Sequence, residues 1–163
     1  MATGDTLKLI GRTIADKYAV ESVVGEGGFA TVYKATHLIW KRPVALKVFK
    51  ALTDFSDKDR QKLLDEFIQE GALLADLSTR TAAIVQARDI GMLDGEGASG
   101  VPFMVLEWLE GATLEAVLAD EKARGLALRS AAEVVHLLDP AAEALALGGA
   151  GLSTVRARTR RRR

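Results

Sequence analysis

A glycine-rich segment is the first part of this sequence whose residue types could do chemistry. From Gly25 to Val32 the chain reads Gly-Glu-Gly-Gly-Phe-Ala-Thr-Val. Because glycine has no Cβ, backbone N–H groups in such a segment can approach phosphate oxygens closely. The spacing fits a Gly-x-Gly-x-x-Gly-x-Val loop, with Ala30 in the place of the third glycine. On its own the segment predicts only a hairpin, and it indicates a phosphate-binding loop if other residues support that interpretation.

A lysine in an aliphatic strand supplies such support. The segment Val44-Ala-Leu-Lys-Val-Phe49 follows the glycines by about one strand. At the two-residue period of a strand, Ala45 and Lys47 share one face. The small alanine leaves room for a flat base, and the ammonium group can reach a phosphate. A Walker loop would end in Gly-Lys-Ser/Thr, and a Rossmann loop would lead from a strand into a helix, so the sequence disfavours both.

Glu70 is a candidate partner for Lys47. It lies in Phe67-Ile-Gln-Glu-Gly-Ala-Leu-Leu74, within a segment of helical apolar spacing. A carboxylate on the buried side of this helix could pair with Lys47 and hold it extended toward a phosphate. Glu66, one turn earlier, is a rival partner, and most helix glutamates simply face water. The sequence leaves this choice open.

The elements that must position these residues are mainly strands. Alternating β-rich runs and turn residues predict five strands, over residues 18–24, 30–37, 44–49, 84–92 and 101–106. A hairpin joins the first two, and a flexible loop at 94–100 joins the last two. Between the third and fourth strands, apolar residues recur at spacings of three and four from Ser56 to Leu77, which predicts a helix.

Two more helices and a tail are predicted after the last strand. A short helix is expected over 113–122, and a longer one from Ser130, where Ser130 and Glu133 form a capping box. Pro140 should kink the longer helix, and the glycines at 148–151 should break it. The residues that follow have no apolar periodicity and no acidic side chain. Residues 148–163 are therefore predicted to be a disordered Arg-rich tail.

Composition excludes several classes of protein. The 163 residues include 22 basic and 22 acidic side chains, but six arginines lie in the last eight residues. The rest of the chain is thus mildly acidic, which disfavours a generally basic nucleic-acid binder. The chain has no cysteine, no secretory-signal pattern and no apolar run that could span a bilayer. We therefore expect a cytoplasmic protein without membrane contact.

The motifs occur in a recognisable order. The glycine hairpin, Val-Ala-Leu-Lys47, the helix with Glu70 and then Phe103-Met-Val-Leu-Glu-Trp-Leu-Glu-Gly111 resemble the N-terminal lobe of protein kinases. The resemblance is greatest to bacterial, eukaryotic-like Ser/Thr kinases and covers roughly residues 18–146. It implies an α+β fold, in which a five-stranded antiparallel sheet with one long helix is followed by two helices of an incomplete C-lobe.

The resemblance also implies how the chain is organised and what it binds. An N-terminal extension at 1–17 would precede an ATP-binding N-lobe at 18–109 and a partial C-lobe at 110–147. Lys47 would contact the α- and β-phosphates and pair with Glu70 as the catalytic ion pair. Leu106 would be the gatekeeper, and residues 107–109 the hinge. The residues expected to bind ATP are Val24, Gly25, Glu26, Gly27, Gly28, Phe29, Ala30, Thr31, Val32, Ala45, Lys47, Leu106, Glu107, Trp108 and Leu109.

Several parts of a kinase are missing from this sequence. The family's His-Arg-Asp-x-x-x-x-Asn, Asp-Phe-Gly and Ala-Pro-Glu motifs are absent, and the chain contains no Asn. Asp54-Phe55-Ser56 echoes the metal motif but precedes the helix with Glu70, which is the wrong place. The family would use Mg²⁺, yet its protein ligands are not here, so we expect negligible phosphotransfer. A truncated or frame-shifted kinase gene would explain this inventory, and a protein substrate would be phosphorylated only if the missing lobe were supplied.

Two other functions stay open. The chain could be a non-catalytic regulatory or interaction module of kinase fold. Alternatively, the Arg tail could bind nucleic acid or another anionic surface, because clustered arginines give salt-dependent, non-specific affinity. The helices expected from 113 and 130 would also expose Leu and Val without a second lobe, so self-association is a further expectation.

Overall fold

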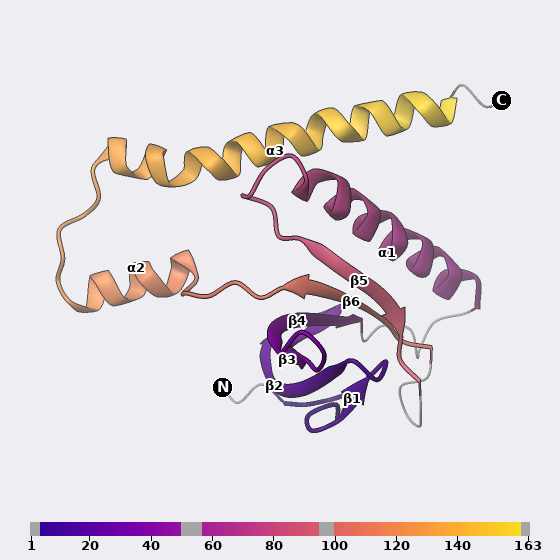
Figure 1. Ribbon diagram of the computed structural model, residues 1–163. Helices are drawn as coiled ribbons and strands as arrows, with labels where there is room; N and C mark the ends of the chain where they lie inside the picture. The colour runs from indigo at the N-terminus through magenta and orange to yellow at the C-terminus, as the bar shows by residue number, and fades with distance from the viewer. Residues whose placement is uncertain (1–3, 50–56, 95–99, 161–163) are drawn as a thin grey trace. The chain divides into compact units, whose positions relative to one another are not determined.

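The computed structural model describes residues 4–49, 57–94 and 100–160. Within these ranges the chain forms an α+β fold of six strands and three helices (Figure 1). The strands are β1 (Thr13–Ile14), β2 (Tyr18–Glu26), β3 (Ala30–His37), β4 (Arg42–Phe49), β5 (Ala87–Met92) and β6 (Pro102–Glu107). The helices are α1 (Asp57–Ser78), α2 (Leu114–Ala123) and α3 (Ala131–Arg160).

All neighbouring strands pair antiparallel, in the order β1-β2-β3-β4-β6-β5. The prediction of five strands is therefore wrong by one, because the sheet gains β1 within the expected N-terminal extension. β1 pairs Thr13 with Ala19 and Ile14 with Tyr18. Two residues are too few to show a two-residue period, which explains why the sequence pattern missed this strand. Positive φ angles at Ala15 and Asp16 turn the chain from β1 into β2.

Several boundaries differ from the predicted ones. The strand expected from residue 84 begins at Ala87, whereas α1 ends at Ser78, one residue beyond Leu77. The expected helix start at Ser56, the Asp54-Phe55-Ser56 segment and most of the loop at 94–100 lie outside the described residues.

The core lies on one face of the sheet. Burial alternates along β3 and β4, so that Tyr33, Leu46 and Val48 point inward and are at most 1% exposed. Phe103 on β6 is 2% exposed and meets the ring of Tyr18 edge-on at 6.4 Å between centroids. Gly91 on β5 lies against Phe103 so closely that a Cβ there would be 2.7 Å from the ring. Glycine at this position is therefore required by the close approach of the aromatic ring.

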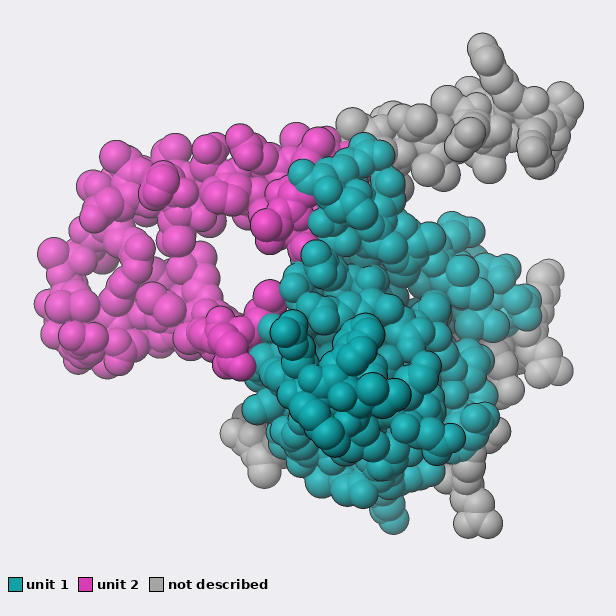
Figure 2. Space-filling view, viewed as in Figure 1, with its two compact units in different colours: residues 1–80, 85–108 teal, residues 81–84, 109–163 magenta. Residues whose placement is uncertain are grey.

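The chain divides into two compact units, which are coloured separately in Figure 2. The first, residues 1–80 and 85–108, contains the sheet and α1. The second, residues 81–84 and 109–163, contains α2 and α3. No helix in the described part of the chain is both long and apolar enough to cross a membrane.

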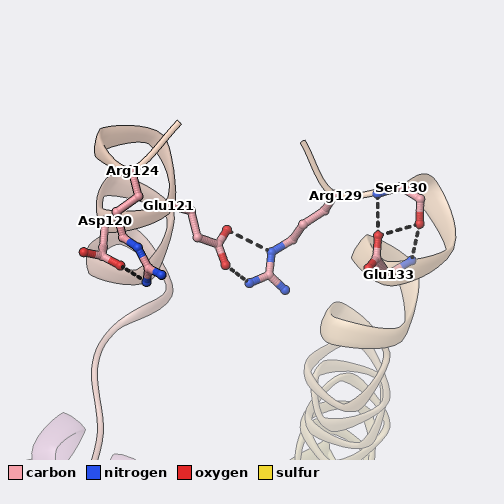
Figure 3. Close-up of polar contacts among 6 residues, drawn as sticks. All are labelled: Asp120, Glu121, Arg124, Arg129, Ser130 and Glu133. Atoms are coloured by element: carbon pink, nitrogen blue, oxygen red, sulfur yellow. Dashed lines mark hydrogen bonds and ion pairs between the residues drawn. The ribbon is translucent and has the colours of Figure 1, made fainter. Parts of the chain in front are cut away.

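Polar contacts define the start of both helices in the second unit. Thr113 caps α2, because its side chain accepts a hydrogen bond from the Ala116 amide at 3.1 Å. Ser130 and Glu133 form the predicted capping box on α3, as Figure 3 shows. Arg129 makes a two-point ion pair with Glu121 across the connecting segment, in which Arg129 Nε donates at 3.1 Å.

The prediction that the glycines at 148–151 break the last helix is wrong, because the backbone stays helical through them. α3 continues through Pro140 and past the glycines at 148–151 to Arg160. A proline removes one backbone hydrogen bond, and each glycine costs only about 1 kcal/mol relative to alanine, so neither forbids a helix. The segment between them, Ala-Ala-Glu-Ala-Leu-Ala-Leu, consists of strong helix formers.

The capping box gives a testable effect on α3. Ser130→Ala removes the oxygen that accepts from the Glu133 amide at 3.3 Å, and it should destabilise the helix by about 1 kcal/mol. Helical content measured by circular dichroism is expected to fall in this variant. Ser78→Ala is the control, because Ser78 bonds a carbonyl at the end of α1 and leaves α3 untouched. An unchanged spectrum for Ser130→Ala would contradict the assignment.

Candidate functional site

The glycine-rich segment forms the turn between β2 and β3. The Gly27 amide donates to the Ala30 carbonyl at 2.8 Å and closes the hairpin, while Phe29 at its tip is 74% exposed. Neither Gly27 nor Gly28 has a positive φ. A Cβ at Gly28 would meet nothing within 4 Å, and one at Gly25 or Gly27 would make only ordinary contacts. The fold itself therefore does not require glycine here, and the lack of side chains at these positions leaves room for another group to approach the backbone closely.

Lys47 and Glu70 form an ion pair between β4 and α1. Lys47 Nζ donates to Glu70 Oε1 at 2.8 Å, with the two side chains 27% and 44% exposed. Glu66, the rival partner, instead pairs with Lys62 on its own helix at 3.8 Å. A half-exposed pair adds little to stability, on the order of 0–1 kcal/mol. Its main effect is to fix the direction of the Lys47 ammonium group.

Of the residues predicted to bind ATP, Val32, Ala45 and Leu106 lie on the same sheet face as Lys47. Val32 lies directly opposite Lys47 in the register of β3 and β4. Ala45 lies directly opposite Leu106 in the register of β4 and β6. All four side chains are half-buried, unlike their fully buried neighbours in the strands. Three adjacent strands thus present a small, partly apolar surface with one ammonium group at its edge.

A cavity of about 400 Å³ adjoins the ion pair in the first unit. It is lined by Phe29, Ala30, Lys47, Phe49, Leu63, Glu66, Phe67, Glu70 and Pro102. The rings of Phe49 and Phe67 meet edge-on at 4.7 Å and form part of its apolar wall. Of the predicted site residues, this cavity brings together Phe29, Ala30, Lys47 and Glu70.

Sequence reasoning missed the apolar wall of this cavity. Leu63, Phe67 and Glu70 are spaced four and three residues apart, so they share one helix face. That spacing was a usable signal once Glu70 was taken as the partner of Lys47, because the residues that share its helix face then also border the ion pair.

Glu107, the first residue of the expected hinge, is held by backbone and side-chain hydrogen bonds to Gln86, which precedes β5. The Glu107 amide donates to the Gln86 carbonyl at 3.0 Å, and the Gln86 amide donates to the Glu107 carboxylate at 2.9 Å. Lys34 Nζ lies 5.2 Å from the centroid of the Trp108 ring, a cation–π contact. The buried indole nitrogen of Trp108 has no hydrogen-bond partner. Leu109 follows in the second unit and is 66% exposed.

The described residues do not offer a ligand set for a divalent metal. They contain no cluster of three or more His, Cys, Asp or Glu side chains that could hold one. The two carboxylates beside the cavity, Glu66 and Glu70, are each paired with a lysine. His37 uses Nδ1 to accept from the Ile39 and Trp40 amides, and its ring stacks on Trp40. These residues therefore do not fit a protein-held Mg²⁺.

Asp5 is a residue that sequence reasoning did not single out. Its carboxylate accepts hydrogen bonds from the Leu9 and Ile10 amides at 3.0 and 2.9 Å and from the Tyr33 hydroxyl at 2.9 Å. Burial raises the pKa of Tyr33, and the neighbouring Asp5 raises it further. Burial also tends to raise the pKa of Asp5, but the hydrogen bonds it accepts outweigh this effect and hold the pKa below its ordinary value.

Acidification is expected to remove the contribution of Asp5 to stability. Because the folded-state pKa is depressed, this contribution is fully present above the ordinary aspartate pKa of about 3.9. This contribution of Asp5 to stability is lost as the pH falls from the ordinary aspartate pKa through the lower pKa that Asp5 has in the folded state. Denaturant midpoints of the wild type and Asp5→Asn should therefore converge as the pH drops from 6 toward 2.5. A difference that stays constant over this range would contradict the prediction.

Comparison with known proteins gives a consistent class of relatives. No protein-family model matches the chain. The chain is 33% identical over 122 residues to the serine/threonine-protein kinase pkn3 of Myxococcus xanthus, a match that covers 74% of this chain and 20% of that protein. It is 30% identical over 132 residues to the probable serine/threonine-protein kinase PknB of Corynebacterium glutamicum, covering 81% and 19%. The match to the serine/threonine-protein kinase PrkC of Bacillus subtilis is 31% over 107 residues, covering 66% and 15%.

A solved structure supports the fold. PpkA-294 in its apo form superposes with a TM-score of 0.56 at 24% identity, covering 71% of this chain and 43% of that chain. The chain is therefore kinase-like in sequence and fold. Over roughly 70% of its length it is a homologue of bacterial serine/threonine protein kinases, and it spans about a fifth or less of the curated relatives named above.

Proposed function

We propose that this chain binds ATP in the first unit, between the glycine hairpin and the sheet face that carries Lys47. The observation that carries the proposal is the Lys47–Glu70 pair at 2.8 Å beside a hairpin whose glycines the fold does not need. The pair holds the ammonium group in a fixed direction, and the lack of side chains at Gly27 and Gly28 lets phosphate oxygens approach the backbone of the turn closely. The likeness to serine/threonine protein kinases favours ATP over other phosphate ligands.

The base of the nucleotide would lie on the half-buried face formed by Val32, Ala45 and Leu106. Ala45 lies opposite Leu106 in the register of β4 and β6, and its small side chain would leave room for a flat ring. Backbone groups of Glu107 and Trp108 would complete the base contacts. Lys47, opposite Val32, then lies on the phosphate side.

We further propose that these 163 residues do not transfer phosphate by themselves. Phosphoryl transfer needs positioned metal ions, which neutralise the charge that develops on the phosphate, and a residue that orients the acceptor hydroxyl. The sequence contains neither the His-Arg-Asp nor the Asp-Phe-Gly motif. Lys47 and Glu70 are then a positioning pair for the nucleotide, and protein Ser/Thr is a substrate only where further kinase residues complete the site.

The test is a titration of the purified chain with ATP, with and without Mg²⁺, followed by a phosphorylation assay on a general protein substrate. Saturable ATP binding without phosphate transfer is expected. Absence of saturable binding would overturn the first proposal and favour a regulatory or interaction module. Magnesium-dependent phosphorylation that is abolished by Lys47→Met would overturn the second.

A further inference from the structure

Residues 4–12, here called the N-terminal arm, are built into the sheet that carries the glycine hairpin. The Gly11 amide donates to the Val20 carbonyl at 3.0 Å, and the Val20 amide donates to the Arg12 carbonyl at 2.9 Å. Leu9 is 1% exposed and belongs to the hydrophobic core. The arm is therefore fixed to β2 by the backbone and to the core by one buried side chain.

Asp5 joins this arm to β3. Its carboxylate holds the Leu9 and Ile10 amides and, at the same time, accepts from the hydroxyl of Tyr33, which is fully buried. Lys8, which lies between Asp5 and Leu9 in the sequence, has a positive φ of 51°. A non-glycine residue in this conformation is strained, so the turn from Asp5 to Leu9 depends on the hydrogen bonds that Asp5 accepts. A buried hydroxyl without this partner would keep the full cost of its lost hydration.

Tyr33 is placed where the glycine hairpin begins. It pairs with Val23 on β2, and the β2–β3 register shifts between Val23 and Gly25. Such an irregularity bends a strand and weakens its local pairing. The Asp5–Tyr33 bond therefore supports the hairpin next to one of the two shifts in its register.

A second contact reaches the hairpin itself. The Thr6 hydroxyl lies 3.3 Å from Glu26 Oε1, and also 3.5 Å from the Gly4 carbonyl. Glu26 is the residue between Gly25 and Gly27, at the end of β2. Two successive residues of the arm thus contact both strands of the hairpin, one through Tyr33 and the other through Glu26.

We propose that Asp5 and Thr6 are positioning residues that restrain the glycine hairpin, and that the N-terminal arm thereby sets how tightly the hairpin covers the phosphates. The effect on nucleotide rests on the proposed ATP binding, whereas the restraint of the hairpin does not. Loops with few buried contacts open readily, so a restraint at the base of this turn should change its opening equilibrium.

The test compares Thr6→Val and Asp5→Asn with the wild type by amide hydrogen exchange over residues 27–30 and by ATP titration. Both variants should raise hairpin exchange by roughly three- to tenfold and weaken ATP binding by about two- to fivefold, as expected for loss of one hydrogen bond. Thr36→Val is the matched control, because the Thr36 hydroxyl bonds Glu21 on the same two strands but away from the glycines. It should change neither readout.

The outcomes separate the two proposals. Unchanged hairpin exchange in both arm variants, or faster exchange with unaltered ATP affinity, would overturn the positioning role. Faster hairpin exchange in a protein whose wild type binds no ATP would overturn the proposed function and leave the restraint of the hairpin supported. Thr6 is exposed, so Thr6→Val remains informative if Asp5→Asn fails to fold.

Discussion

Replacing Lys47 with methionine is expected to weaken ATP binding by roughly ten- to a hundredfold. A hydrogen bond to a charged group contributes about 1.5–3 kcal/mol, and each 1.4 kcal/mol corresponds to a factor of ten in affinity. Methionine keeps much of the length of the side chain but removes the charge and the donors. Titration with a fluorescent ATP analogue, followed by competition with ATP, measures the change.

Lys62→Met is the matched control for this substitution. Lys62 lies on α1 and pairs with Glu66, so the variant also removes one lysine and one ion pair beside the same helix. Its ATP affinity should stay within about twofold of the wild type, since an exposed pair contributes little. Equal losses in Lys47→Met and Lys62→Met would show that general charge, and not the directed ammonium group, attracts the nucleotide.

Glu70→Gln tests whether Glu70 acts by orienting Lys47, which itself is proposed to contact the phosphates. Glutamine keeps the shape of the side chain but removes the charge that holds Lys47 at 2.8 Å. A smaller loss of affinity than in Lys47→Met is expected, because the ammonium group remains and is only less well oriented. A larger loss would contradict the assignment of Lys47 as the group that contacts phosphate.

Replacing Phe103 with alanine is expected to lower the free energy of unfolding by about 3–5 kcal/mol. Phe103 is 2% exposed, contacts Tyr18, and fills the space left by Gly91 on the neighbouring strand. Its loss removes a large apolar surface and leaves a cavity that the paired strands β5 and β6 cannot close. Chemical denaturation monitored by circular dichroism measures the difference.

Two variants keep this prediction informative. Phe29→Ala removes the same side chain at a position that is 74% exposed, and it should change stability by no more than about 0.5 kcal/mol. Phe103→Leu, which leaves a smaller cavity, should fold and lose less than Phe103→Ala. Similar losses for Phe29→Ala and Phe103→Ala would contradict the position of Phe103 in the core.

The sequence by itself determined the elements whose patterns are long and local. The three strands around the glycines and Lys47, the long helix with Glu70 and the capping box at Ser130 were all predictable. Each depends on a period of two or 3.6 residues, or on a cap within three residues, and such signals need no distant contact. The order of these motifs was also sufficient to reveal the likeness to serine/threonine kinases.

Tertiary structure alone decided the contacts between distant parts of the chain. Glu66 and Glu70 are one helical turn apart, so only the packing of α1 on β4 selects Glu70 as the partner of Lys47. Asp5 meets Tyr33 across 28 positions of sequence, and β1 is a strand only because β2 lies beside it. Local propensities differ by about 1 kcal/mol or less per residue, so packing and hydrogen bonds from outside a segment readily override them.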